Sequence, residues 1–283
     1  MKISRRLSRV LVRIAIHVAA WFVAFLWLLP FMGVFMAAFR PMEEILSGWW
    51  DFSSFHQTLK NFIEAWNHPS VPVSMGIVNS LIVAIPATVI PLLCGALAAY
   101  VFSRFKFPAN DLLFLLIVLL MAVPPQMLAV PLFLLMSKLK LVDNLLGLSL
   151  FHSANGLAWI ILFLRNYMET LPRDFEDAAR VDGASEYQVF FRVVLPCLAP
   201  ALFSIAVLQF TWVWNDFFFA LILIYSPNKL LISQRIPFMK GEYHVPWSLL
   251  CAGSVIMMTV PVILYAVFQK YFVKGIIGGT IKG

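Results

Sequence analysis

The chain has 283 residues, of which 61% are hydrophobic and 12% are charged, and its formal net charge is +7. Soluble domains carry about 25% charged residues, so this composition excludes an ordinary soluble fold and favours an integral membrane protein. In such a protein the positive charge is informative through its distribution along the chain rather than as a sign of nucleic-acid binding.

Six segments are long and apolar enough to cross a bilayer, which takes about 20 mostly apolar residues. They lie at about 14–39, 74–102, 112–136, 145–164, 198–225 and 248–269. With the N-terminus placed in the cytoplasm, most Lys and Arg residues between these segments fall on the inner side. Because cytoplasmic loops are enriched in basic residues, we predict an all-α membrane protein with six transmembrane helices and both termini in the cytoplasm.

The chain is expected to have three parts. Residues 1–73 form a basic N-terminal segment, the first transmembrane helix and an outer loop. Residues 74–271 form the transmembrane core, and 272–283 form a cytoplasmic C-terminal tail. Within the core, Pro124 and Pro125 are expected to bend or interrupt the third span, because proline removes a helical hydrogen bond.

The segment between the fourth and fifth spans holds a concentration of charged residues. Asp174, Glu176 and Asp177 suit the N-terminus of a helix, and Arg173–Asp177 and Glu176–Arg180 have the i,i+4 spacing of ion pairs. Gly183 is a plausible end for that helix, and Ser185 with Gln188 has the spacing of a capping box that opens a second helix. This predicts a helix–turn–helix at the membrane surface; the alternative is an ordinary solvated amphipathic loop.

The same segment resembles the cytoplasmic signature of the permeases of binding-protein-dependent ABC importers. That signature reads Glu-Ala-Ala, three residues, Gly, nine residues, Ile, one residue, Leu-Pro. Here Asp177-Ala178-Ala179 is followed by Gly183, Val193 and Leu195-Pro196 at the same spacing, with Asp in place of Glu and Val in place of Ile. We refer to residues 170–196 as the signature loop.

The resemblance extends to the carbohydrate-type branch of the family, which includes maltose and glycerol-phosphate permeases. The run Arg180 to Ser185, the sequence Trp214-Asn215-Asp216 and the tail from Gln269 are similar to that branch. The resemblance implies a type I ABC importer permease fold in the bacterial cytoplasmic (inner) membrane. It also implies a non-catalytic subunit that forms half of the translocation pathway of an ATP-driven importer of a sugar or sugar-like solute.

The implied partners are a second homologous permease, an extracytoplasmic solute-binding protein and two ATPase subunits, which would bind ATP and Mg. This chain would bind no cofactor. In the family, the signature loop docks into a groove on the ATPase and couples its movement to the spans. The residues that carry this expectation here are Glu176, Asp177, Ala178, Ala179, Arg180, Asp182, Gly183, Ala184, Leu195 and Pro196.

The predicted fifth span carries polar residues at helical spacing, in two stripes. Ionisable residues inside a membrane are functional candidates by default, and a sugar needs both polar and aromatic partners. Together with a polar residue of the fourth span, the candidates for a substrate pathway are Gln209, Thr211, Trp212, Trp214, Asn215, Asp216 and Ser153. The alternative is that these polar groups join helices to one another.

The sequence contains no phosphate-binding loop, no H-E-x-x-H and no G-x-S-x-G, so no motif supports an enzyme. The scattered His and Cys residues predict no metal site. An ion-coupled secondary transporter of a small polar solute remains the alternative function. Such carriers are often built from inverted repeats, and none is detectable here.

Overall fold

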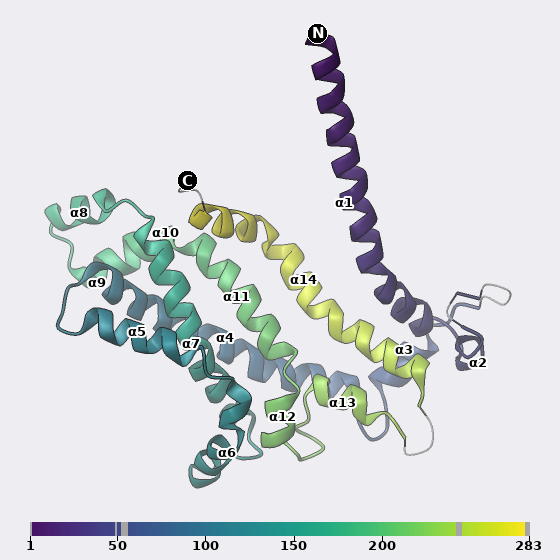
Figure 1. The fold of residues 1–283 in the computed structure, drawn as a ribbon. Coiled ribbons are helices and arrows are strands. Elements are labelled where there is room, and N and C mark those ends of the chain that lie inside the picture. Colours follow the sequence, from purple (N-terminus) through teal and green to yellow (C-terminus); the bar gives the residue numbers. More distant parts are fainter. Residues whose placement is uncertain (1, 49, 52–55, 242–244, 281–283) are drawn as a thin grey trace. The chain divides into compact units, whose positions relative to one another are not determined.

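The structure is a computed structural model that describes residues 2–48, 50–51, 56–241 and 245–280. All regular secondary structure in these residues is helical, as the composition predicts. The chain divides into two compact units. One contains residues 1–68 and 239–256, and the other contains residues 69–238 and 257–283 (Figure 1).

The first unit contains helix α1 (Lys2–Ala38) and two short helices, α2 (Met42–Ile45) and α3 (Lys60–Trp66). The last carbonyl groups of a helix have no partner within it. Here the buried Asn61 amide donates to the carbonyl oxygens of Ala38 and Arg40, at 2.9 Å each. This ties α3 to the end of α1. Residues 49 and 52–55 of the expected outer loop lie outside the described residues.

The second unit is built on α4 (Val73–Arg104) and α7 (Leu145–Glu169), which pack along each other. Small residues let membrane helices approach closely, and Gly95 of α4 faces α7 in this way. A Cβ atom at Gly95 would lie only 2.6 Å from Ile160.

The other helices of the second unit are shorter. They are α5 (Asn110–Leu120), η1 (Pro125–Leu128), α6 (Ala129–Lys138), α8 (Asp174–Val181), α9 (Glu186–Val189), η2 (Phe190–Val194), α10 (Leu195–Cys197), α11 (Ala199–Trp214), α12 (Phe218–Leu223) and α13 (Ile232–Phe238). Helix α14 (Trp247–Thr280) runs from the first unit into the second.

Four of the described helices are long and apolar enough to cross a membrane, and six spans result if each of two bent helix pairs counts as one. The third predicted span is bent by 89° between α5 and the η1–α6 segment, so the bend expected at Pro124 and Pro125 is confirmed. The expected sixth span lies within α14, which continues to Thr280.

The fifth predicted span, 198–225, is not one continuous helix. It follows a 71° bend near Leu198, and α11 ends at Trp214. The chain starts again as α12 because the Asp216 carboxylate accepts hydrogen bonds from the backbone N–H groups of Phe219 and Ala220, at 3.4 and 3.0 Å. An aspartate that binds its own downstream backbone in this way favours a helix start over a helix interior.

Two prolines inside long helices leave carbonyl groups without a helical donor, and α11 supplies the missing donors. Pro91 cannot donate to Ala87, and the Gln209 amide donates to that carbonyl at 3.0 Å. Pro261 cannot donate to Met257, and the Trp214 indole N–H donates there at 3.1 Å. Prolines are tolerated in membrane helices where neighbours satisfy the freed groups. These two bonds therefore fasten α11 to α4 and to α14.

An aspartate clasp joins the α6–α7 connection to the segment after α12. The Asp143 carboxylate accepts hydrogen bonds from the N–H groups of Tyr225 and Ser226, and Lys229 lies 3.1 Å from it. Burial raises the pKa of Asp143, but the bonds from Ser226, Tyr225 and Lys229 outweigh burial and hold that pKa well below its ordinary value. The carboxylate is therefore ionised at neutral pH, and the clasp is charged.

The proline-freed carbonyls yield a stability prediction. Gln209→Leu leaves the Ala87 carbonyl unsatisfied, which costs about 1–3 kcal/mol. In a Pro91→Ala background, residue 91 regains its N–H, so we expect the same replacement to cost about 1 kcal/mol less. The free energies of unfolding of the wild type, the two single variants and the double variant, purified in detergent, measure this coupling.

The matched control replaces Pro86 instead of Pro91, because Gln209 does not contact the carbonyl that Pro86 frees. Pro86→Ala and Gln209→Leu should be additive. Equal costs of Gln209→Leu in the wild-type and Pro91→Ala backgrounds would contradict the assignment.

Candidate coupling site and substrate pathway

The signature loop folds as the predicted helix–turn–helix. Helix α8 ends at Val181, and Gly183 follows with φ of +84°, a conformation that favours glycine. The capping box is present: the Ser185 N–H donates to the Gln188 side chain at 2.8 Å, and the Gln188 N–H donates back to the Ser185 hydroxyl at 3.4 Å. Both local predictions are confirmed. The chain then continues through η2 and α10 toward α11.

The expected coupling residues divide into an inner and an outer set. Glu176 is buried, and Ala179 and Ala184 pack against the buried core cluster that also holds Val189 and Phe190. Leu195 also packs against this cluster. On the other side, exposed residues of the signature are Asp177, Ala178, Asp182, Gly183 and Pro196.

The exposed side of α8 is apolar along one line. Phe175, Ala178 and Val181 are spaced three residues apart, and we call them the apolar stripe. Phe175 is 66% exposed and Val181 is 88% exposed. A contiguous apolar patch in a loop that is otherwise charged is typical of a protein contact surface. The stripe is a signal that the sequence analysis missed, although its spacing is readable in the sequence.

Glu176 faces α4 rather than the outside of the loop. The Arg104 guanidinium donates to its two carboxylate oxygens through Nε, at 2.8 and 3.1 Å, and Arg104 Nη2 also donates to the Met168 carbonyl at 3.0 Å. Both side chains of the pair are at most 4% exposed. A buried carboxylate needs such a partner, because an unpaired charge is very costly to bury. Glu176 therefore does not share the outward position of Asp177.

A second set of bonds joins α8, α9 and α4. Arg180 donates from Nε to Glu186 and from Nη1 to Asp177, at 2.7 Å in each case. The Tyr100 hydroxyl of α4 donates to the same Glu186 carboxylate at 2.8 Å. The predicted Glu176–Arg180 contact is present at 3.5 Å.

The predicted pair between Arg173 and Asp177 does not form. Arg173 instead donates to the Ser103 carbonyl at 3.2 Å, and Arg180 takes Asp177. Both arginines lie one helical turn from Asp177, but Arg173 is directed to α4, whereas the bond to Glu186 holds the Arg180 guanidinium beside Asp177. The α4 partners of the loop, Tyr100, Ser103 and Arg104, lie 70 to 86 residues away in sequence, and no local pattern identifies them.

The candidate pathway residues occupy different surroundings. Gln209 and Trp214 are buried and satisfy the proline-freed carbonyls. The hydroxyls of Ser153 and Thr211 donate to carbonyls of their own helices, those of Ser149 and Val207. These four side chains have their polar groups engaged within the fold, as in the helix-joining alternative.

Asp216 lies in the break between α11 and α12. Besides capping α12, its carboxylate lies 3.4 Å from Nε2 of His152 on α7. The His152 side chain is 8% exposed, and the pair lies between α7 and the break. The helical stripe expected to join Asp216 to Gln209 does not continue, because α11 has already ended.

Two candidates remain exposed, and α7 adds two further residues. Trp212 is 60% exposed, and its ring lies 5.0 Å from that of Trp159, centroid to centroid. Asn215 is exposed at the end of α11, and Asn155 is exposed on α7 one turn before Trp159. The paired indoles offer aromatic faces, although the Trp159 indole N–H donates to the Gln209 side chain at 3.0 Å. The Asn215 amide N–H donates to the Thr211 carbonyl at 2.9 Å, so this surface offers the Asn215 side-chain oxygen and the Asn155 amide as polar groups. Trp159 and Asn155 are not among the candidates predicted from the sequence.

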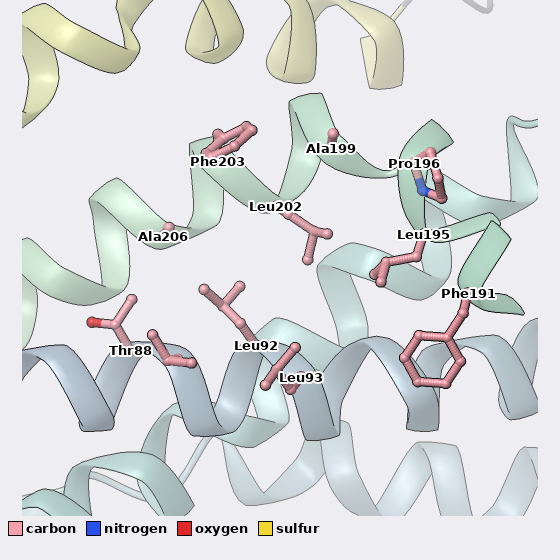
Figure 2. A pocket seen from close by; sticks show the side chains of 11 residues that line it. Thr88, Leu92, Leu93, Phe191, Leu195, Pro196, Ala199, Leu202, Phe203 and Ala206 are labelled. Atoms are coloured by element: carbon pink, nitrogen blue, oxygen red, sulfur yellow. The ribbon is translucent and has the colours of Figure 1, made fainter. Parts of the chain in front are cut away.

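An apolar groove with a volume of about 540 Å³ opens between α4 and the bent α10–α11 segment. Figure 2 shows Leu92 and Leu93 of α4 facing Leu195 and Leu202 across it. Thr88 is the one lining residue with a polar side chain, and its hydroxyl donates to the Ala84 carbonyl. The groove therefore offers a sugar no free polar partner. Among the described residues no three His, Cys, Asp or Glu side chains are grouped as a metal site.

Known proteins match this chain over most of its length. Residues 91–278 match the family model of the binding-protein-dependent transport system inner membrane component. A probable ABC transporter permease protein of Pyrococcus horikoshii is 51% identical, over 94% of this chain and 96% of that protein. The alpha-glucoside transport system permease protein of Rhizobium meliloti is 37% identical, over 80% of this chain and 60% of that protein.

A solved structure shares the fold. It is that of a bacterial ABC transporter involved in the import of the acidic polysaccharide alginate, with a TM-score of 0.78 and 23% identity. The match covers 92% of this chain and 95% of that one. With the family match over more than half of the sequence, the chain belongs to the inner membrane components of binding-protein-dependent transport systems and is a permease subunit of an ATP-driven importer.

Proposed function

We propose that this chain imports a sugar or sugar-like solute, as one of two homologous permeases in the bacterial inner membrane. It has six spans, counting each bent pair as one, and both termini are cytoplasmic. The signature loop then lies in the cytoplasm, where it docks on one of two ATPase subunits that bind ATP and Mg. A solute-binding protein delivers the solute from outside. The lysine and arginine distribution supports this orientation.

The apolar stripe is the observation that supports docking of the signature loop on an ATPase. Phe175, Ala178 and Val181 are exposed on one side of α8, while the other side is held to α4 through the buried Glu176. Apolar residues in the centre of a protein interface supply much of its binding energy, and a rigid helix loses little entropy when it docks. The loop is thus a preformed surface for an ATPase. Asp177 and Asp182 border it and would steer a basic rim of the partner.

The sugar class rests on the exposed Trp212 beside the half-buried Trp159, on the exposed amides of Asn155 and Asn215, and on the relative named for alpha-glucoside transport. We propose that Asn155, Trp159, Trp212 and Asn215 line the pathway, because a sugar ring stacks its C–H face on an aromatic ring and its hydroxyls bind amides. Gln209, Trp214, Thr211 and Ser153 then shape the pathway through helix packing rather than by contact with the solute. Asp216 positions α12 and His152.

Docking of the ATPase can be tested with Val181→Glu. The substitution puts a charge at the C-terminal end of the apolar stripe, where it must be desolvated on docking. Because Val181 is 88% exposed, the chain should fold and insert normally. We expect the tagged permease from its native host to lose its co-purifying ATPase while it keeps the second permease, as measured by quantitative mass spectrometry.

The matched control is Thr170→Glu, which adds the same charge at an exposed position just before α8. It should retain the ATPase. Retention of the ATPase at wild-type stoichiometry by Val181→Glu would rule out the stripe as the docking surface.

The pathway can be tested with Trp212→Ala and Asn215→Ala in the assembled complex. An aromatic contact is worth about 1 kcal/mol, so its loss at Trp212 should lower uptake of the transported alpha-glucoside roughly fivefold. Radiolabelled maltose and sucrose are suitable probes in cells that lack the chromosomal copy. Thr211→Val should keep its uptake, because the Thr211 hydroxyl is bound within its own helix.

If the two variants transport as well as the wild type, at equal amounts of assembled complex, the lining assignment is wrong. Uptake of neither sugar by the wild type would leave the importer assignment standing and would remove the alpha-glucoside class.

A further inference from the structure

The C-terminal end of α4 is bonded to the signature loop at three points. Arg104 holds the Glu176 carboxylate and the Met168 carbonyl, Tyr100 holds Glu186, and the Ser103 carbonyl accepts from Arg173. The Arg104 bond to Glu176 reaches α8, the Tyr100 bond reaches α9, and the Ser103 bond reaches Arg173 at the start of α8. The loop is therefore attached to a helix to which it is not connected by the adjacent chain.

These bonds lie over a shared apolar core. Ala96, Ala99 and Tyr100 of α4 are buried in the same cluster as Val189, Phe190 and Val194 of the loop. The Arg104–Glu176 pair is sealed from solvent, with side chains 3% and 4% exposed. A close ion pair in such surroundings is strong and directional. The end of α4 and the loop consequently form one packed body.

The other end of α4 is bonded just as closely to the segment that follows α12. The Asn79 amide donates to the carbonyls of Asn228 and Leu230, at 2.9 and 3.1 Å. The Ile232 N–H donates to the Ser80 hydroxyl at 3.0 Å. Gly76 lets this segment approach, since a Cβ there would lie 2.7 Å from Arg235.

Between these ends α4 is a single helix of 32 residues, about 48 Å long at 1.5 Å per residue. Figure 1 shows α8 and α9 at one end of this unit and α12 and α13 away from them. A helix that is bonded at both ends moves both attached segments when it moves. Loops without such bonds would absorb a displacement instead.

We propose that α4 is the strut that carries movement of the signature loop to residues 227–235 across the membrane, and that Arg104 is the positioning residue that joins the strut to the loop. The proposal rests on the proposed docking of the loop on an ATPase. Movement of the docked ATPase displaces α8, Glu176 pulls Arg104, and α4 shifts against the 227–235 segment. Tyr100 provides the parallel connection through Glu186.

The test uses a reporter at the far end of α4 in the purified complex with its native partners. Asn228 is exposed, and it accepts the Asn79 bond through its backbone carbonyl, which a cysteine retains, so Asn228→Cys is a suitable labelling site. Cys94, Cys197 and Cys251 are replaced by alanine. The rate of maleimide labelling at position 228 is measured without nucleotide and with ATP plus vanadate. ATP should change this rate several-fold in the background with Arg104 intact.

In Arg104→Gln the complex should keep its ATPase, and the ATP-dependent change at position 228 should be lost. Tyr100→Phe, which keeps the ring and removes the hydroxyl, should reduce the change. The exchanged pair Arg104→Glu with Glu176→Arg should restore part of it. Arg165→Gln is the matched control, because Arg165 pairs with Glu169 on α7 and not with the loop. It should leave the change intact.

An unaltered ATP-dependent change in Arg104→Gln, or no such change in the background with Arg104 intact, would overturn the proposal. If the Arg104→Gln complex loses its ATPase, the Tyr100→Phe variant provides the test instead. A full ATP-dependent change in labelling at position 228 in Tyr100→Phe would then overturn the proposal. Absence of any co-purifying ATPase from the unmodified chain is a different result, because it contradicts the proposed docking rather than the strut.

Discussion

The buried ion pair between Arg104 and Glu176 fixes the position of the signature loop. Removal of one partner from such a pair leaves a buried charge, at a cost of about 3–5 kcal/mol, so the loop cannot leave α4 without a large penalty. With Glu176 turned inward, α8 must turn its opposite side outward. That side is the apolar stripe of Phe175, Ala178 and Val181. One interaction thus attaches the loop and also decides which surface it presents.

A second constraint comes from the prolines of the spans. Pro91 and Pro261 each free a carbonyl in a long helix, and α11 supplies a donor to both. A carbonyl without a hydrogen-bond donor is costly in lipid, so both bonds are needed. They attach α11 to α4 and to α14 at two different positions along its length. This explains why the polar residues of α11 are divided. Gln209 and Trp214 bond to carbonyls of other helices, whereas the side chains of Trp212 and Asn215 are exposed, with the Asn215 amide bonded to the Thr211 carbonyl of α11.

Local signals in the sequence predicted local structure well. Gly183 ends α8, Ser185 and Gln188 form the capping box, and the Pro124–Pro125 pair bends the third span, because each depends on stereochemistry within a few residues. The attachment of Glu176 to Arg104 depends on tertiary packing and was not predictable from spacing. The break after Trp214 was missed because hydropathy is continuous there, while Asp216 caps a new helix. Pro91 and Pro261 indicate in the sequence that two helical carbonyls lack a backbone donor. Only the fold shows which side chains donate to those carbonyls.

The most direct test of this account is a photo-crosslinking scan of residues 174–188 in the complex with its native partners. A photoreactive amino acid is placed at one position at a time, and adducts with the ATPase are quantified. The account predicts strong crosslinks at positions 175, 178 and 181, with weak ones at 176 and 179, which face α4 and the core. Strongest crosslinks at 176 and 179, or adducts spread evenly over the loop, would contradict the orientation that the Arg104–Glu176 pair imposes.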